Sequence, residues 1–124
     1  MTTSEKIVLI VEDDMFLMKA YELKFQKEGI QVWTTSDGKE ALTFLEKPPP
    51  SVVLLDLLLP GVSGFEILAA IRKSENWRSV PVLVLSNLSQ AGDLERAKAL
   101  GVEDYLIKAN TKINDIVDKV KKYL

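Results

Sequence analysis

Short apolar runs alternate with segments of helical periodicity along the whole chain, and this alternation limits the possible folds more than any other feature. Five apolar runs, several of them rich in Val, Ile and Leu, are each followed by a segment whose apolar residues recur every three or four positions. Continuous runs of this kind predict strands that are buried on both faces of a sheet. Because consecutive strands separated by a helix need crossover connections, the pattern predicts an α/β fold with a parallel sheet.

The alternation divides the chain into five strand–helix units. Strands are expected at residues 7–11, 30–34, 52–56, 80–86 and 105–108. Helices are expected at residues 15–28, from residue 37 to the three prolines at 48–50, from residue 63, around residues 94–100, and from residue 113 to 124. The expected N-caps are Asp14, Asp37 and Ser63. The glycines expected to end helices are Gly29 and Gly101.

The composition removes several classes of function. The chain has 124 residues without a break in composition, which predicts one domain over residues 1–124. It lacks cysteine and histidine, so it has no disulfide, no thiol nucleophile, no histidine catalysis and no phosphohistidine of its own. A net charge of −2 gives no reason to expect direct binding to nucleic acid or to an anionic membrane. The sequence has no signal-peptide pattern and no apolar stretch of membrane-spanning length, so we expect a cytoplasmic protein.

Polar residues stand at the ends of the apolar runs. Asp56 closes the third expected strand, and a buried strand has no reason to carry a carboxylate unless something at its end uses it. Glu12 and Asp13 follow the first run, Ser86 closes the fourth, and Lys108 closes the fifth. Ligands bind parallel α/β sheets outside the carboxyl ends of the strands, so these residues are expected to share one site.

The chemistry of this set favours phosphoryl transfer assisted by a metal ion. Close carboxylates repel one another, so a cation is expected between them, and an all-oxygen site suits Mg²⁺. Asp56 can then act as a nucleophile and form an aspartyl phosphate. The Lys108 ammonium would neutralise charge on the phosphoryl group, and the Ser86 hydroxyl would donate a hydrogen bond to it.

Together these residues resemble the receiver domains of two-component response regulators. The matching positions run in order over nearly the whole chain: Glu12, Asp13, Asp56, Pro60, Gly61, Gly64, Ser86, Tyr105 and Lys108. The resemblance implies a doubly wound, flavodoxin-like sheet of five strands in the order 2-1-3-4-5. It also implies a signalling domain, not an enzyme, that takes a phosphoryl group from a sensor histidine kinase or a histidine phosphotransfer protein. A downstream protein target would then read its state.

The same resemblance implies how the metal and the phosphoryl group are held. Asp56 would be the phosphoacceptor. Mg²⁺ would be bound directly by Asp13 and Asp56, through water by Glu12, and by the backbone carbonyl of Leu58. Asp14 lies one position beyond the matching acidic pair, so it keeps the role of a helix cap.

The resemblance also implies a conformational switch. Ser86 would move towards the phosphoryl group and the Tyr105 ring would follow it inward, which changes the face formed by the fourth helix, the fifth strand and the last helix. Lys108 would bind the phosphoryl group beside Ser86.

Two positions depart from the usual family pattern. Ala109 follows Lys108 where the family usually has proline, and a cis peptide bond before alanine costs about 2.5–4 kcal/mol. This cost favours a trans bond, but the sequence does not decide between cis and trans, and the reach of Lys108 to the phosphoryl group stays open with it. Asn87 stands where a small residue is common, and its amide is expected to crowd or hydrogen-bond the phosphoryl group. Leu58 and Leu88 are expected to shield an acyl phosphate from water.

Alternative interpretations remain open at this point. A flavin- or nucleotide-binding protein would need a Gly- or Ser/Thr-rich loop after the first strand, where this chain has three acids. A phosphatase with an aspartate nucleophile would need a second carboxylate shortly after Asp56, where the chain has three leucines. A pseudo-receiver, which is never phosphorylated, would bind Mg²⁺ poorly, and the departures at Asn87 and Ala109 keep this alternative open. Taken singly, each polar residue could be a cap, a turn residue or a solvated strand end.

Overall fold

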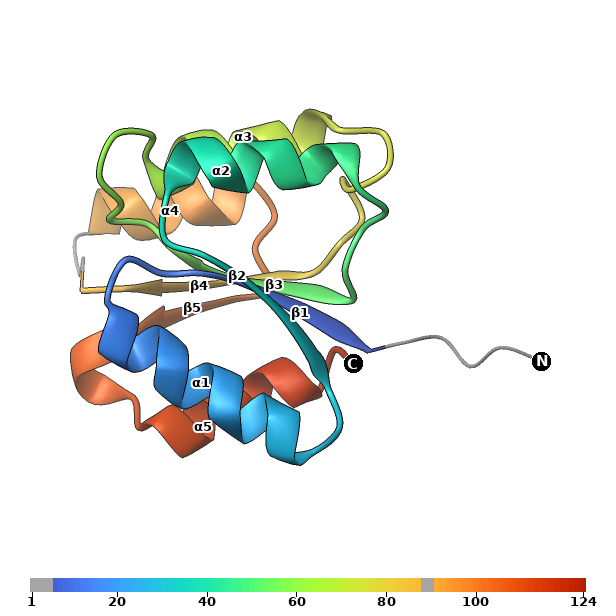
Figure 1. Ribbon diagram of the computed structural model, residues 1–124. Helices are drawn as coiled ribbons and strands as arrows, with labels where there is room; N and C mark the ends of the chain where they lie inside the picture. Colours follow the sequence, from blue (N-terminus) through green and yellow to red (C-terminus); the bar gives the residue numbers. More distant parts are fainter. Residues whose placement is uncertain (1–5, 88–90) are drawn as a thin grey trace.

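A parallel sheet of five strands forms the centre of the protein (Figure 1). The computed structural model describes residues 6–87 and 91–124. The strands are β1 (Ile7–Val11), β2 (Gln31–Thr35), β3 (Val52–Asp56), β4 (Val82–Ser86) and β5 (Asp104–Ile107). Their order is β2-β1-β3-β4-β5 and every neighbouring pair is parallel, so the predicted doubly wound topology is confirmed.

Helices enclose the sheet in two layers. They are α1 (Met15–Lys27), α2 (Gly38–Thr43), α3 (Gly64–Lys73), α4 (Ala91–Ala99) and α5 (Ile113–Lys121), with short 3-10 turns η1 (Phe44–Glu46) and η2 (Lys108–Asn110). Figure 1 shows α1 and α5 on one face of the sheet and α2, α3 and α4 on the other. In the described part of the chain, no helix is long and apolar enough to cross a membrane.

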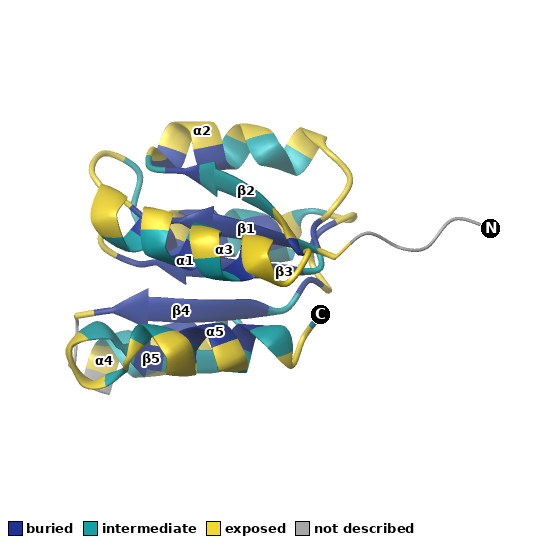
Figure 2. Ribbon diagram, turned by 60° about the horizontal axis from the view of Figure 1, so that its bottom comes forward, coloured by how far each residue is buried: buried dark blue, intermediate teal, exposed yellow. Residues whose placement is uncertain are grey.

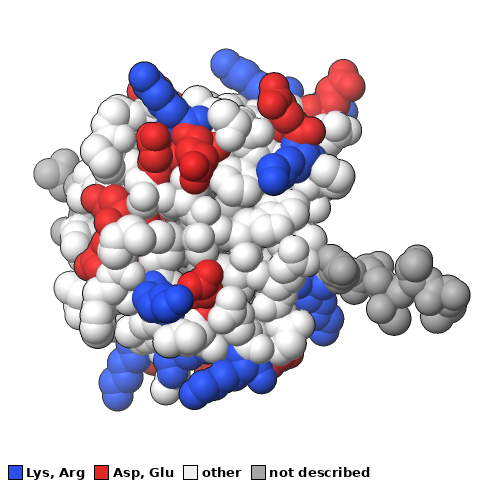
Figure 3. Space-filling model, in the orientation of Figure 1, with Lys and Arg blue, Asp and Glu red and all other residues white. Residues whose placement is uncertain are grey.

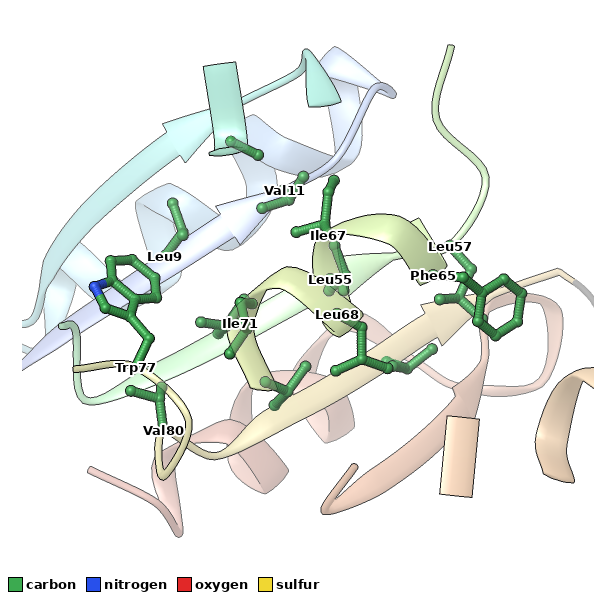
Figure 4. Close-up of a cluster of buried hydrophobic side chains, with 14 of the residues drawn as sticks. Leu9, Val11, Leu55, Leu57, Phe65, Ile67, Leu68, Ile71, Trp77 and Val80 are labelled. Atoms are coloured by element: carbon green, nitrogen blue, oxygen red, sulfur yellow. The ribbon is translucent and has the colours of Figure 1, made fainter. Parts of the chain in front are cut away.

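Each face of the sheet has its own apolar core. Successive side chains of a strand point to opposite faces, so a strand covered on both sides is apolar at every position. Figure 4 shows the core under α3, which contains Leu9, Leu55, Ile67, Leu68 and Trp77. The core under α1 and α5 contains Val8, Ile10, Leu54, Tyr21, Phe25 and Val117. Figure 2 shows the consequence, because buried residues fill most of the inner strands β1, β3 and β4, whereas buried and exposed residues alternate along the helices.

The predicted N-caps are confirmed. Asp14 Oδ1 accepts hydrogen bonds from the backbone N–H groups of Phe16 and Leu17, at 3.0 and 3.1 Å. Asp37 caps α2 through the N–H of Lys39, and Ser63 caps α3 through the N–H of Glu66. Each cap satisfies N–H groups that the first turn of a helix cannot bond internally. The segments after β1 and β3 are thereby fixed at the edge of the sheet where Glu12 and Asp56 lie.

Several predicted boundaries are wrong by one to three residues. Strand β2 lies one residue later than predicted, and β4 begins at Val82 because Pro81 has no N–H to donate to the ladder. Helix α1 ends one residue earlier than predicted, and α5 ends at Lys121 instead of continuing to residue 124. Strand β5 ends at Ile107, so Lys108 does not close the strand but opens the 3-10 turn η2.

Candidate functional site

Two buried carboxylates lie side by side at the carboxyl edge of the sheet. Val11 of β1 pairs with Leu55 of β3, so the next residues, Glu12 and Asp56, are neighbours across the strands. Glu12 is only 1% exposed and Asp56 only 2%, whereas Asp13 is exposed. One carboxylate oxygen from each of these three residues lies within 4.8 Å of the other two. Burying adjacent negative charges is unfavourable unless a cation or a proton compensates them.

Lys108 supplies a cation to both buried acids. Its Nζ lies 2.8 Å from Glu12 Oε1 and 2.8 Å from Asp56 Oδ2. The Lys108–Ala109 peptide bond is trans, and the ammonium reaches the acidic pair. Burial lowers the pKa of Lys108, but its hydrogen bonds to Asp56 and Glu12 outweigh burial and raise the pKa above its ordinary value. Lys108 is therefore a permanent positive charge at this site.

Glu12 has one oxygen that the described residues leave without a hydrogen bond. Its Oε1 accepts hydrogen bonds from Lys108 Nζ and from the backbone N–H of Asp14, the latter at 3.1 Å. Its Oε2 is buried and has no partner within residues 6–87 and 91–124. Burial, helped by the negative charge of Asp56 and opposed by the Lys108 hydrogen bond, raises the pKa of Glu12 to about 7. An oxygen of this kind needs a proton, a water molecule or a metal ion as its partner.

The acidic cluster borders an open pocket. The pocket has a volume of about 400 Å³, and its lining residues are Asp13, Asp14, Asp56, Leu58, Asn87 and Lys108. Five of these six are residues that the sequence singles out for the site. The sixth, Asp14, was predicted only as the cap of α1, and the structure shows that it caps α1 and also lines the pocket. Its position next to Asp13 in the sequence is the signal that could have indicated this. Leu88, expected to shield the pocket together with Leu58, lies outside the described residues.

The backbone around Asp56 holds its carboxylate in one orientation. The N–H of Leu58 donates a 2.9 Å hydrogen bond to Asp56 Oδ1, while Lys108 bonds to Oδ2. Gly64 begins α3 directly against this segment, because a Cβ atom there would lie 2.5 Å from the carbonyl oxygen of Asp56. Only glycine permits so close an approach. The nucleophile predicted from the sequence is thus buried in a strand, fixed at both oxygens and adjacent to an open pocket.

Ser86 and Tyr105 lie next to the pocket but are not among the residues that line it. Ser86 is fully buried at the end of β4, and Tyr105 is half-buried in the adjacent strand β5. Burial raises the pKa of the Tyr105 hydroxyl, and a hydrogen bond with Ser86 opposes that increase. The two residues of the predicted switch are therefore in direct contact.

Comparison with known proteins establishes the family. The family model of the response regulator receiver domain matches residues 8–121. The chain belongs to this family. Receiver domains are signalling domains of two-component systems, and they interact with histidine kinases, with phosphotransfer proteins or with downstream targets.

The curated relatives differ in length from one another. The chain is 32% identical over 119 residues to the polar-differentiation response regulator DivK of Brucella ovis, and the alignment covers 96% of both proteins. It is 38% identical to the probable methanogenesis regulatory protein FilR2 of Methanothrix harundinacea, with 94% of this chain and 82% of that protein covered. It is 36% identical to the transcriptional regulatory protein KdpE of Mycobacterium tuberculosis, but there it spans only 44% of the relative's length.

Solved receiver structures share the fold over almost the whole chain. The receiver domain of the sensor histidine kinase PA1611 from Pseudomonas aeruginosa is 28% identical, with a TM-score of 0.83 and coverage of 97% of this chain and 98% of the other. That structure contains a magnesium ion coordinated in its active-site cleft. The chemotaxis protein CheY4 of Vibrio cholerae is 26% identical, with a TM-score of 0.87 and coverage of 98% and 100%.

The residues of this receiver domain fit a magnesium ion. Carboxylate oxygens from Glu12, Asp13 and Asp56 converge within 4.8 Å, and hard oxygen ligands of this kind are those that Mg²⁺ prefers. The buried Oε2 of Glu12 adds acceptor capacity that no described protein donor uses.

Proposed function

We propose that this protein, as one receiver domain over residues 1–124, accepts a phosphoryl group on Asp56 in a Mg²⁺-dependent reaction. The donor would be the phosphohistidine of a sensor histidine kinase or a histidine phosphotransfer protein, and the output would be contact with a downstream protein. One observation carries the proposal. Asp56 is almost fully buried, yet it borders an open pocket and has the Lys108 ammonium 2.8 Å from its Oδ2. A carboxylate held in this way suits a nucleophile better than a structural acid.

The transfer would exchange one bond for another at phosphorus. An Asp56 carboxylate oxygen forms the new O–P bond while the P–N bond to the donor imidazole breaks, and the imidazole keeps the electron pair. The N–H of Leu58 holds the carboxylate oriented, and Lys108 remains an ammonium that neutralises charge on the phosphoryl oxygens. No acid–base residue is required, because phosphoryl transfer depends mainly on positioning and electrostatics.

Mg²⁺ would be held by the carboxylates of Asp13 and Asp56 and by the backbone carbonyl of Leu58, with Glu12 acting through water. The ion would supply positive charge to the phosphoryl oxygens. The role of this chain's own residues is to offer oxygen ligands and, directly beside Glu12 and Asp56, the Lys108 ammonium.

The signal would pass through Ser86 and Tyr105. The Ser86 hydroxyl would turn from its contact with Tyr105 towards a phosphoryl oxygen, and the Tyr105 ring would move inward. This exchange changes the surface formed by α4, β5 and α5, where a partner protein would read the state.

A second candidate function is a pseudo-receiver that is never phosphorylated. Asn87 favours it, because its amide lines the pocket that a phosphoryl group would enter. The two functions differ in metal affinity, since a pseudo-receiver should bind Mg²⁺ poorly.

The proposal is tested by intact mass after incubation with Mg²⁺ and a small acyl-phosphate donor. We expect a gain of one phosphoryl group that requires Mg²⁺ and is absent from Asp56→Ala. Asp115→Ala, which removes an exposed acid on α5, is the matched control and should gain the group normally. No gain by a folded wild-type protein would favour the pseudo-receiver, and reversion of Asn87 and Ala109 to the usual family residues would be the next step.

A further inference from the structure

Lysine side chains gather over the C-terminal halves of α1 and α5, far from the acidic pocket. Figure 3 shows Lys and Arg along the lower edge of the molecule, where Figure 1 places these two helices. We propose that the groove between the helix ends, called the α1–α5 groove below, binds an acidic, partly apolar segment of a partner protein. The inference does not depend on phosphorylation of Asp56.

The groove is built where the two helices meet at their ends. Two adjacent open hollows of about 390 and 190 Å³ share Glu28 and Lys121 in their walls. An ion pair between Lys121 and Glu28, which line both hollows, joins α5 to the end of α1. The other residues that line them are Lys6, Lys24, Lys27, Ile30, Asn114, Val117, Asp118 and Leu124.

The charge of the groove is opposite to that of the whole chain. The described residues that line it include four lysines and two acidic side chains, although the protein has a net charge of −2. One carboxylate, Glu28, is already paired with Lys121. Lys6, Lys24 and Lys27 make no ion pair within residues 6–87 and 91–124. Unpaired lysines on an acidic protein form a local positive field that attracts an acidic partner.

The residue types in the groove favour a protein segment over nucleic acid or membrane. Among the described residues that line the groove, the basic ones are all lysines, and there is no arginine to bind phosphate through two hydrogen bonds and no aromatic ring to stack on a base. Asp118 and Glu28 interrupt the positive charge, which disfavours the continuous negative charge of a phosphate backbone or an anionic lipid surface. Val117 and Ile30 are buried beneath the groove, so the apolar surface that it offers comes from the half-buried Leu124, which suits an apolar side chain beside the acids.

The groove is also independent of the candidate functional site. Twelve residues of helix separate Met15, at the pocket end of α1, from Lys27 at the groove, a rise of about 18 Å. A partner bound in the groove would leave the acidic pocket open. Substitutions in the groove should therefore leave Mg²⁺-dependent labelling of Asp56 unchanged.

The test is an NMR titration of the full chain with a synthetic amphipathic peptide rich in glutamate and leucine. We expect saturable shifts of backbone signals at Lys24, Lys27, Asn114 and Lys121, and binding that weakens as salt is added. The double variant Lys24→Glu/Lys27→Glu should bind about tenfold more weakly or worse. The milder Lys24→Gln/Lys27→Gln should lose affinity to a smaller extent, so that the test does not rely on one variant.

The matched control is Lys39→Glu/Lys73→Glu, which changes the net charge equally but at exposed residues of α2 and α3 in the opposite layer. It should keep wild-type affinity. Equal loss in the control, shifts outside the groove or no saturable binding would overturn the proposal. Tighter binding to phosphatidylserine vesicles or to duplex DNA than to the peptide would also overturn it, in favour of a membrane or nucleic-acid partner.

Discussion

At the scale of single residues, the site consists of two buried acids that share one ammonium. The sequence predicts that Glu12 and Asp56 meet, because strand ends in a parallel sheet share one edge. It does not predict that Lys108 bonds to both, since that geometry depends on the η2 turn and on the side-chain rotamer. Burial of Glu12, together with the negative charge of Asp56, outweighs this one ammonium, so the pKa of Glu12 stays raised.

The raised pKa of Glu12 makes stability depend on pH. The pKa is about 7 in the folded protein and ordinarily 4.5, so between these values the folded state binds more protons than the unfolded state. The free energy of unfolding, measured by urea denaturation without Mg²⁺, should therefore fall as the pH rises through this window. Glu12→Gln should flatten the dependence, whereas Glu40→Gln, at an exposed position, should retain it. An unchanged slope in Glu12→Gln would contradict the assignment.

At the scale of elements, local sequence signals predict the helices and their caps, but they do not predict contacts between residues far apart in the sequence. Caps such as Asp14 and Ser63 depend on neighbouring residues, and both are found where predicted. Arg72 shows the opposite case. Its guanidinium donates to the carbonyls of Leu100 and Gly101 after α4, and to those of Arg78 and Val80 before β4. These partners lie up to 29 residues away, and no spacing in the sequence marks them.

Trp77 is a second non-local contact, and it yields a prediction for stability. The ring is fully buried, and its Nε1 donates a 2.8 Å hydrogen bond to the carbonyl of Lys47, across 30 residues. Trp77→Phe keeps an aromatic ring but leaves that carbonyl without its donor, which should lower the free energy of unfolding by about 1–3 kcal/mol. Chemical denaturation measures the change. Trp33→Phe, at a half-buried ring stacked on Phe44, is the comparison and should cost less; an equal cost would mean that ring volume, not the hydrogen bond, matters.

At the scale of the whole molecule, apolar surface is concentrated at the pocket end. Five large hydrophobic side chains are exposed within the described residues: Met15, Phe16, Leu23, Leu58 and Tyr123. Met15 and Phe16 open α1 directly after the acidic cluster, and Leu58 lines the pocket itself. Of these five residues only Leu58 is singled out from the sequence, because exposure depends on what the rest of the chain covers. Apolar side chains around this pocket would suit the docking of the protein donor proposed above.

A variant at Phe16 can distinguish the docking of a partner from the transfer reaction itself. Phe16 is 79% exposed, and only its backbone N–H takes part in the α1 cap. Phe16→Ser should therefore leave phosphorylation of Asp56 by a small acyl phosphate unchanged. It should slow transfer from a phosphorylated histidine phosphotransfer protein by about tenfold, the loss expected when an aromatic anchor is removed from an interface. Leu23→Ser, at a 49% exposed residue further along the same helix, is the matched control and should transfer normally. Equal slowing with both donors would mean that Phe16 supports the pocket and not the docking of a partner.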